Sequence, residues 1–234
     1  MLQPKPLRAR FLVAALCVGW SGTALAQGQE RGVVFAGGTI APSSSAYVGT
    51  SVALPGGALG RGPALRVVGS WSEFNYTSGA TSIDGRSAGI AVAGVYQWSG
   101  SWGYANISAG VAYRDTDLSP DDPGNPNRGT QWDGVVGVDG MHNLGDWRVG
   151  GLASYGFNLE EYYARLELTR AVSGTLRLGA EGVAQGDPNF ERQQLGALVA
   201  FAPAPRWEVR LSAGAFFEDT GDGAYGAVAL SRTF

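Results

Sequence analysis

The sequence has little cysteine, lysine or histidine and little charge of either sign. Its 234 residues include one cysteine, Cys17, one histidine, His142, and one lysine, Lys5. A single cysteine excludes a disulfide scaffold, and a single histidine excludes a metal cluster built on several histidines. Charged residues make up 16% of the chain, whereas soluble domains usually carry about 25%. This scarcity argues against a basic nucleic-acid binder and against an ordinary cytosolic enzyme.

The amino terminus has the pattern of an export signal. Lys5, Arg8 and Arg10 precede an apolar run over residues 11–20, which the small-x-small triplet 24–26 follows. This pattern predicts a signal peptide over residues 1–26 and a mature single-domain chain over residues 27–234. Cleavage would also remove the only cysteine. No later segment approaches the roughly 20 consecutive apolar residues of a membrane-spanning helix.

The mature chain consists of short segments in which apolar and polar residues alternate. In residues 207–218, for example, Trp207, Val209 and Leu211 share one face, and Glu208 and Arg210 lie on the other. A period of two indicates β-strands, because a helix would place residues three and four apart on one face. We expect twelve strands, at residues 32–41, 46–54, 63–76, 85–98, 102–115, 130–142, 147–158, 161–171, 175–185, 191–201, 207–218 and 224–234.

The connections between these segments predict a membrane barrel. Outer-membrane barrels have short periplasmic turns and longer outer loops, and twelve strands return both termini to the periplasm. The sequence therefore predicts an all-β fold, a transmembrane antiparallel up-and-down β-barrel in the bacterial outer membrane. A ten-stranded barrel and a soluble β-sandwich or lipocalin-like barrel are the alternatives. The tight links are 99–101, 145–146, 173–174 and 202–206, and the longer polar links on the opposite side are 77–84, 116–129, 186–190 and 219–223.

Aromatic residues gather near both sets of connections, as the two interfaces of a membrane would require. Four tryptophans flank the tight links: Trp98, Trp102, Trp147 and Trp207. A second group lies near the longer links: Trp71, Phe74, Tyr76, Tyr113, Trp132, Tyr155, Phe157, Tyr162 and Phe217. The chain ends at Phe234, and a terminal phenylalanine on an amphipathic strand resembles the sorting signal of bacterial outer-membrane barrels.

If the apolar face of each strand meets lipid, the opposite face lines the lumen and carries charges of both signs. In a narrow barrel such side chains must be paired, because unpaired buried charge is costly. One interpretation is a network of ion pairs that fills and rigidifies the interior. The other is a narrow pore whose arginines select acidic sugars. The candidates are Arg66, Arg114, Asp133, Asp139, Arg148, Arg165, Glu167, Arg177, Glu181, Arg192, Glu208 and Arg210.

The longest predicted loop, 116–129, contains a group of acidic residues. Paired carboxylates can perform acid–base chemistry or bind calcium. The stretch is also dense in Pro, Gly, Asp and Asn, which form turns for backbone reasons, so a rigid outer loop is the favoured interpretation. Its candidate residues are Asp117, Asp121, Asp122, Asn125 and Arg128. His142 is expected beside a periplasmic turn, on the wrong side for a hydrolase at the outer rim, and no catalytic residue, metal site or cofactor is predicted.

Three stretches resemble a known family. They read YVGTSVALPGGALGRGPALR up to Arg66, LSPDDPGNPNRGT over residues 118–130 and LGAEGVAQGDPNFERQQLGALV over residues 178–199. In this order they resemble the BcsS family of bacterial cellulose-biosynthesis proteins, and SPxDPxNPxxGT is the most distinctive piece. The resemblance implies a non-enzymatic outer-membrane accessory protein that serves the synthesis or export of cellulose. It supplies no catalytic or cofactor-binding residues.

Three functions follow as hypotheses. The first is an accessory barrel for cellulose or another exopolysaccharide, with the outer-membrane lipid, the synthesis or export machinery and the polysaccharide as partners. The second is a small pore for acidic oligosaccharides, and the third is a structural or adhesive barrel that acts through its outer loops. Removal of the signal would leave 14 arginines against 20 acidic residues, a formal net charge of −6 that points to no nucleic-acid partner.

Overall fold

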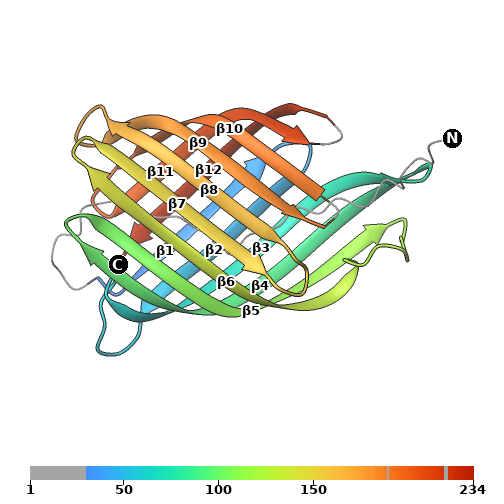
Figure 1. The fold of residues 1–234 in the computed structure, drawn as a ribbon, viewed down its shortest axis with the longest axis horizontal. Helices are drawn as coiled ribbons and strands as arrows, with labels where there is room; N and C mark the ends of the chain where they lie inside the picture. The colour runs from blue at the N-terminus through green and yellow to red at the C-terminus, as the bar shows by residue number, and fades with distance from the viewer. Residues whose placement is uncertain (1–29, 189, 219–220) are drawn as a thin grey trace.

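The computed structural model describes residues 30–188, 190–218 and 221–234, which form one closed antiparallel barrel (Figure 1). The predicted signal peptide lies outside these residues. Among them, no helix is long and apolar enough to cross a membrane. The strands are β1 (Gly32–Ile40), β2 (Ser44–Ala53), β3 (Gly62–Ser78), β4 (Thr81–Gly100), β5 (Gly103–Ser119), β6 (Gly129–Leu144), β7 (Trp147–Gly156), β8 (Tyr162–Ala171), β9 (Leu176–Asp187), β10 (Phe190–Phe201), β11 (Trp207–Glu218) and β12 (Gly223–Thr233).

Each strand pairs with its sequence neighbours, and β1 pairs with β12 to close the barrel. In this closing pair, Val33 lies opposite Thr233. The last residue continues the ladder, because the backbone N–H of Phe234 donates to the carbonyl oxygen of Gly32 over 2.9 Å. Closure removes the free edges that an open sheet would present to lipid. The prediction of a twelve-stranded antiparallel barrel is confirmed.

The two faces of the wall are the reverse of those of a soluble barrel. Large apolar side chains point outward, as with Leu166 and Leu195, each 63% exposed. Charged side chains point inward, and Arg192 and Glu181 are only 3% and 4% exposed. An apolar exterior around a polar interior is the arrangement of a barrel that lies in a membrane. It excludes the sandwich and the lipocalin-like alternative.

Inward-facing glycines make room for inward-facing aromatic rings. A Cβ added at Gly49 would lie 2.2 Å from a ring carbon of Phe35, and one added at Gly196 would lie 2.3 Å from the hydroxyl of Tyr225. Both rings are buried, and each occupies space that a side chain at the glycine would need. The high glycine content therefore has a packing role in the interior.

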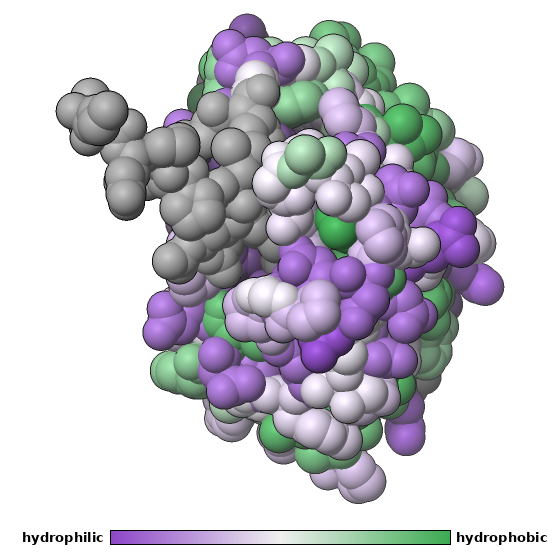
Figure 2. Space-filling view, turned by 90° about the vertical axis from the view of Figure 1, so that its right-hand side faces the viewer, coloured by the Kyte–Doolittle hydropathy of each residue, from purple (hydrophilic) through white to green (hydrophobic). Residues whose placement is uncertain are grey.

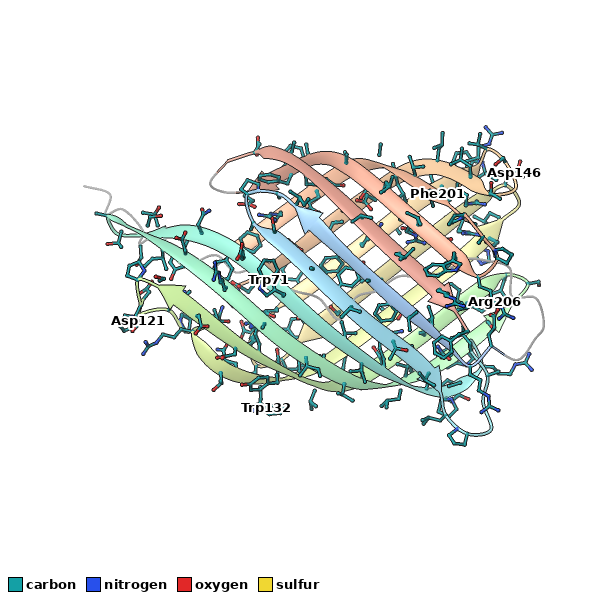
Figure 3. All side chains as sticks on the ribbon, turned by 180° about the vertical axis from the view of Figure 1, so that it is seen from behind. Trp71, Asp121, Trp132, Asp146, Phe201 and Arg206 are labelled. Atoms are coloured by element: carbon teal, nitrogen blue, oxygen red, sulfur yellow. The ribbon has the colours of Figure 1, made fainter. Side chains whose placement is uncertain are left out.

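Strands β3, β4 and β5 extend past the rest of the barrel at one end (Figure 1). They contain 17, 20 and 17 residues, whereas β7 and β8 contain 10 each. We call this end, which also carries the loop 120–128, the extended end. We call the opposite end, with Phe234 and the turns at 145–146 and 202–206, the terminal end. Figure 3 places Asp121 at the extended end and Asp146, Phe201 and Arg206 at the terminal end, with Trp71 and Trp132 on the wall between.

Because strands β3, β4 and β5 are longer than predicted, several predicted loop boundaries are wrong. The loop predicted at 77–84 is wrong, because β3 and β4 pair as far as Ser78 and Thr81 and leave a two-residue turn. Residues 116–119 of the predicted loop belong to β5, and most of 186–190 belongs to β9 and β10. The link of residues 54–61, which joins β2 to β3 at the terminal end, is longer than the predicted tight links at that end.

The extension exists because its inner face is apolar. Phe74, Tyr76 and Ile83 form a buried cluster, and Leu118 packs against it. Phe74 and Tyr76 are only 5% and 6% exposed, so their predicted place in a lipid-facing aromatic belt is wrong. Polar residues lie between the members of this cluster in the sequence, and for this reason the sequence predicted a loop at 77–84. Burial of one face stabilises strand pairing beyond the end of the closed barrel.

Candidate functional site in the barrel interior

The structure places all twelve predicted luminal charges at inward-facing positions of the wall. Eight are buried: Arg66, Asp133, Asp139, Glu167, Glu181, Arg192, Glu208 and Arg210. Arg114, Arg148, Arg165 and Arg177 are half-buried. Their direction follows from the alternation of each strand, since every second side chain points to the same face. The arrangement of their partners divides them into groups along the barrel.

The largest group is a network of ion pairs that lies in the half of the lumen nearer the terminal end and links strands that are not neighbours. The guanidinium of Arg210 on β11 lies 2.9 Å from Glu167 on β8 and 2.8 Å from Glu208 on its own strand. Arg165 lies 2.6 Å from Glu181 and 3.3 Å from Glu167. Because β8 and β11 are separated by two strands, the Arg210–Glu167 pair is a bridge across the interior.

Two further contacts extend this terminal-end network. Arg148 on β7 lies 3.5 Å from Glu208. The hydroxyl of Tyr225 on β12 donates to Glu181 on β9 over 2.8 Å. Tyr225 carries no charge and was not a predicted site residue. Arg177 lies nearby at the start of β9, where it donates to the backbone carbonyl of Asp146 over 2.7 Å.

A second bridge joins β3 to β6. Arg66 lies 2.9 Å from Asp139, and the amide of Asn106 on β5 donates to the other carboxylate oxygen over 2.7 Å. All three side chains are buried. Asp139 is therefore held by a cation and by a neutral donor at once, as a buried carboxylate requires. The sequence analysis did not identify Asn106, because it selected luminal residues by their charge and an amide is neutral.

At the extended end, Arg192 lies between two aromatic rings. Its guanidinium carbon is 5.4 Å from the ring centre of Phe190 and 5.0 Å from that of Phe216. Arg192 also pairs with Glu218 and donates to the hydroxyl of Ser43. Ion pairing and cation–π contacts together fix this side chain against the wall.

The link between β7 and β8, residues 157–161, is held by two predicted luminal residues. Asp133 accepts hydrogen bonds from the backbone N–H groups of Asn158 and Leu159 over 2.8 and 3.4 Å. Arg114 forms a salt bridge with Glu161. Burial raises the pKa of Glu161 above its usual range, and the positive charge of Arg114 opposes that shift. Glu161 was missed, although the alternation of residues 161–171 places it on the inward face.

Arg114, Asp133 and Glu161 line a cavity of about 70 Å³ on the inner face at the extended end. We call it the extended-end cavity, and it is partly open rather than sealed. Its polar lining includes Ser72, Ser87, Arg114, Gln131, Asp133 and Glu161. Seen from the extended end, hydrophilic residues gather across the molecule and apolar residues lie along its flank (Figure 2). Apolar residues such as Ala91, Val135 and Leu159 also line the cavity.

The predicted outer-loop residues do not form one site. Asp117 lies on β5 instead of in the loop, because the strand continues to Ser119. Asp121 pairs with Arg128 over 2.8 Å on the exposed side. Asp122 accepts a hydrogen bond from the hydroxyl of Tyr76 over 2.9 Å, and buried Asn125 donates to the same hydroxyl over 2.9 Å. The loop is thus fastened to the apolar cluster of the extension.

The described residues show no group of three or more His, Cys, Asp or Glu side chains that could hold a metal ion. His142 lies on β6, close to the turn 145–146, and faces outward. Its ring centre is 6.2 Å from that of Trp102. The interior chemistry of the described chain is therefore that of ion pairs, amides and hydroxyls.

Comparisons with known proteins agree with this architecture. The structure aligns with the CymD monoaromatic hydrocarbon channel with a TM-score of 0.57 and 10% identity, over 89% of this chain and 90% of that one. The transport unit of the autotransporter AIDA-I from Escherichia coli gives 0.52 and 9%, over 92% and 94%. The translocator domain of the autotransporter NalP from Neisseria meningitidis gives 0.50 and 14%, over 90% of both chains. Identities this low show the fold alone, which is that of outer-membrane barrels.

A family model also matches the sequence. The model described as cellulose biosynthesis protein BcsS matches residues 33–234, from β1 to the last residue. This match confirms the resemblance seen in the sequence. No sequence among the curated proteins matches this chain.

Proposed function

Because the chain belongs to the BcsS family of cellulose biosynthesis proteins, we propose that it is a non-enzymatic outer-membrane accessory protein for the output of cellulose. One observation carries the proposal: the family match spans all twelve strands. The family's role must then be performed by the barrel and its loops. Under this proposal residues 1–26 are a cleaved export signal, and the mature chain begins at residue 27.

The orientation follows from the same proposal. Both ends of the described chain lie at the terminal end, which would face the periplasm as in other outer-membrane barrels. The extended end, with the loop 120–128, would then face the cell exterior, where the polymer emerges. Membrane lipid is a partner of the outward apolar face. The polysaccharide and the machinery that makes or exports it are the proposed partners of the two ends.

A deletion of the gene in the native host tests the proposal. We expect reduced cellulose, scored by dye binding, and recovery when the intact gene is returned. A variant such as Arg86→Met, which changes one exposed ion pair on the extension, provides a complementation control. Unchanged cellulose in the deletion strain, with the rest of the synthesis genes intact, would contradict the accessory role.

A small pore for acidic oligosaccharides is the second candidate. The observation in its favour is that seven of the twelve predicted luminal residues are arginines. Ion conductance of the refolded protein in planar bilayers tests it, with oligogalacturonate added as a blocker. An anion-selective current that the oligosaccharide blocks would support a pore, and a silent bilayer would count against one.

A further inference from the structure

We propose that the outward rim of the terminal end binds the phosphate groups of anionic phospholipids through Arg170 on β8 and Arg232 on β12. The proposal depends on the placement of the barrel in a membrane and is independent of the role in cellulose output. It goes beyond general contact with lipid, because it assigns two headgroup sites to two named side chains.

Both arginines end the lipid-facing row of their strand. Arg170 follows exposed Leu168 by two positions on β8, and Arg232 follows exposed Leu230 by two positions on β12. Side chains at alternate positions share one face of a strand, so both arginines point outward. Each therefore lies where the apolar band of its strand stops at the terminal end. In a membrane this is the level of the lipid headgroups.

Each arginine stacks on a tryptophan of the neighbouring strand. The guanidinium carbon of Arg170 lies 5.7 Å from the ring centre of Trp147, its register partner on β7. That of Arg232 lies 5.3 Å from the ring centre of Trp207, its register partner on β11. Tryptophan is enriched at membrane interfaces, and a cation–π contact holds each charge over its ring. The same cross-strand pair thus occurs at two places on the rim, with β9 and β10 between them.

The charges of both arginines lack a counter-ion in the part of the chain that the structure describes. Arg170 and Arg232 form no ion pair and donate no hydrogen bond there, whereas exposed Arg206 at the same end pairs with Glu30 over 3.0 Å. Stacking uses the flat face of a guanidinium and leaves the N–H donors along its edge. This fork of donors matches two oxygens of a phosphate group. A headgroup phosphate would therefore supply the counter-ion at each position.

The outward face at the extended end has the opposite charge. Asp84, Asp115 and Asp117 are exposed there, and Arg86, which lies on the same face, already pairs with Glu73. Such a surface repels an anionic headgroup. The preference for anionic lipid is therefore expected at the terminal end alone. Phosphatidylglycerol has a net negative charge, whereas phosphatidylcholine carries an ammonium group beside its phosphate, so the first should bind more tightly.

Native mass spectrometry of the refolded barrel in detergent tests the proposal, with phosphatidylglycerol and phosphatidylcholine of identical acyl chains as the probes. We expect each arginine to favour phosphatidylglycerol about fivefold. Arg170→Gln and Arg232→Gln should each abolish this preference at one site and leave phosphatidylcholine binding unchanged. Arg86→Gln is the matched control, since it removes an exposed arginine that is already paired and lies at the other end. It should bind both lipids as the parent does.

A further variant and a competitor complete the test. Trp147→Leu keeps an apolar residue at the interface but removes the ring under Arg170, so affinity for phosphatidylglycerol should fall about twofold to fivefold. Mobility of unheated samples on gels shows that each variant is folded. Excess inorganic phosphate should not displace the lipid, because the acyl chains contribute to binding at this position. Equal affinity of the parent for both lipids, an unchanged preference when both arginines are replaced, or displacement by inorganic phosphate would each overturn the proposal.

Discussion

Replacement of Arg210 by methionine should destabilise the barrel strongly. Arg210 is 6% exposed and is the cation for two buried carboxylates, those of Glu167 at 2.9 Å and Glu208 at 2.8 Å. Loss of one partner of a buried ion pair typically costs about 3–5 kcal/mol, because the remaining charge stays uncompensated. Arg165 and Arg148 lie 3.3 and 3.5 Å from these two carboxylates and would compensate in part. We therefore expect the lower end of that range, about 3 kcal/mol.

Arg86→Met is the matched control. Arg86 pairs with Glu73 over 3.0 Å, but the two side chains are 75% and 45% exposed. Water already solvates both charges, so the loss should be at most about 1 kcal/mol. The comparison holds the residue type, the substitution and the ion-pair distance nearly constant, and the two sites differ in burial and in the number of paired carboxylates, which is two for Arg210 and one for Arg86.

Urea unfolding of the refolded variants in lipid vesicles measures both free energies, and the mobility of unheated samples on gels reports the folded fraction. Adding Glu167→Gln to Arg210→Met should recover part of the loss, because one of the two stranded charges is then neutral. Equal small losses in Arg210→Met and Arg86→Met would refute the reasoning, since burial would then have no effect on the pairs.

Three other perturbations test the interior. Gly49→Ala places a Cβ 2.2 Å from the ring of Phe35 and should cost about 1–3 kcal/mol in urea unfolding, whereas Gly226→Ala, with nothing within 4 Å, should cost at most about 0.5 kcal/mol. Asp133→Ala frees two backbone N–H groups of residues 157–161, so their amide exchange should accelerate while that of the β3–β4 turn stays unchanged. Glu161→Gln tests pH dependence. Because burial raises the pKa of Glu161, its contribution to stability is present in acid and lost as pH rises through the raised value. Urea unfolding between about pH 4 and about pH 8 should favour the glutamine variant progressively, and parallel curves would contradict this.

The alternation of side chains predicted most of the barrel because both faces of the wall obey it. In β11, Val209 and Leu211 meet the exterior, and Glu208 and Arg210 meet the interior. A one-residue shift would exchange the two sets, so the pattern also fixes which charges point inward. The strand count followed from the same pattern, and the hydrogen bond between Phe234 and Gly32 shows that the last strand returns to the end where β1 starts.

The extension and the cross-lumen partners could not be predicted in this way. Residues 77–84 are almost all small or polar and show no alternation, and only the burial of Phe74, Tyr76 and Ile83 shows that the strands continue. The pairing of Arg66 with Asp139 joins residues 73 apart in sequence on strands that are not neighbours. Periodicity gives the face of a residue, but the curvature of the closed wall decides which inward side chains meet across it.

The distribution of these contacts bears on how such a barrel could serve a polymer. The bridges Arg210–Glu167 and Arg66–Asp139 each join strands that two other strands separate, so a glucan chain in the lumen would have to pass beside them or break them. Each break would strand a buried charge at a cost of about 3–5 kcal/mol, and a neutral sugar hydroxyl cannot replace a counter-ion. Contact with a polymer at either end of the barrel breaks neither bridge and carries no such cost. Contact with the polymer at the extended end is therefore energetically easier than passage through these bridges.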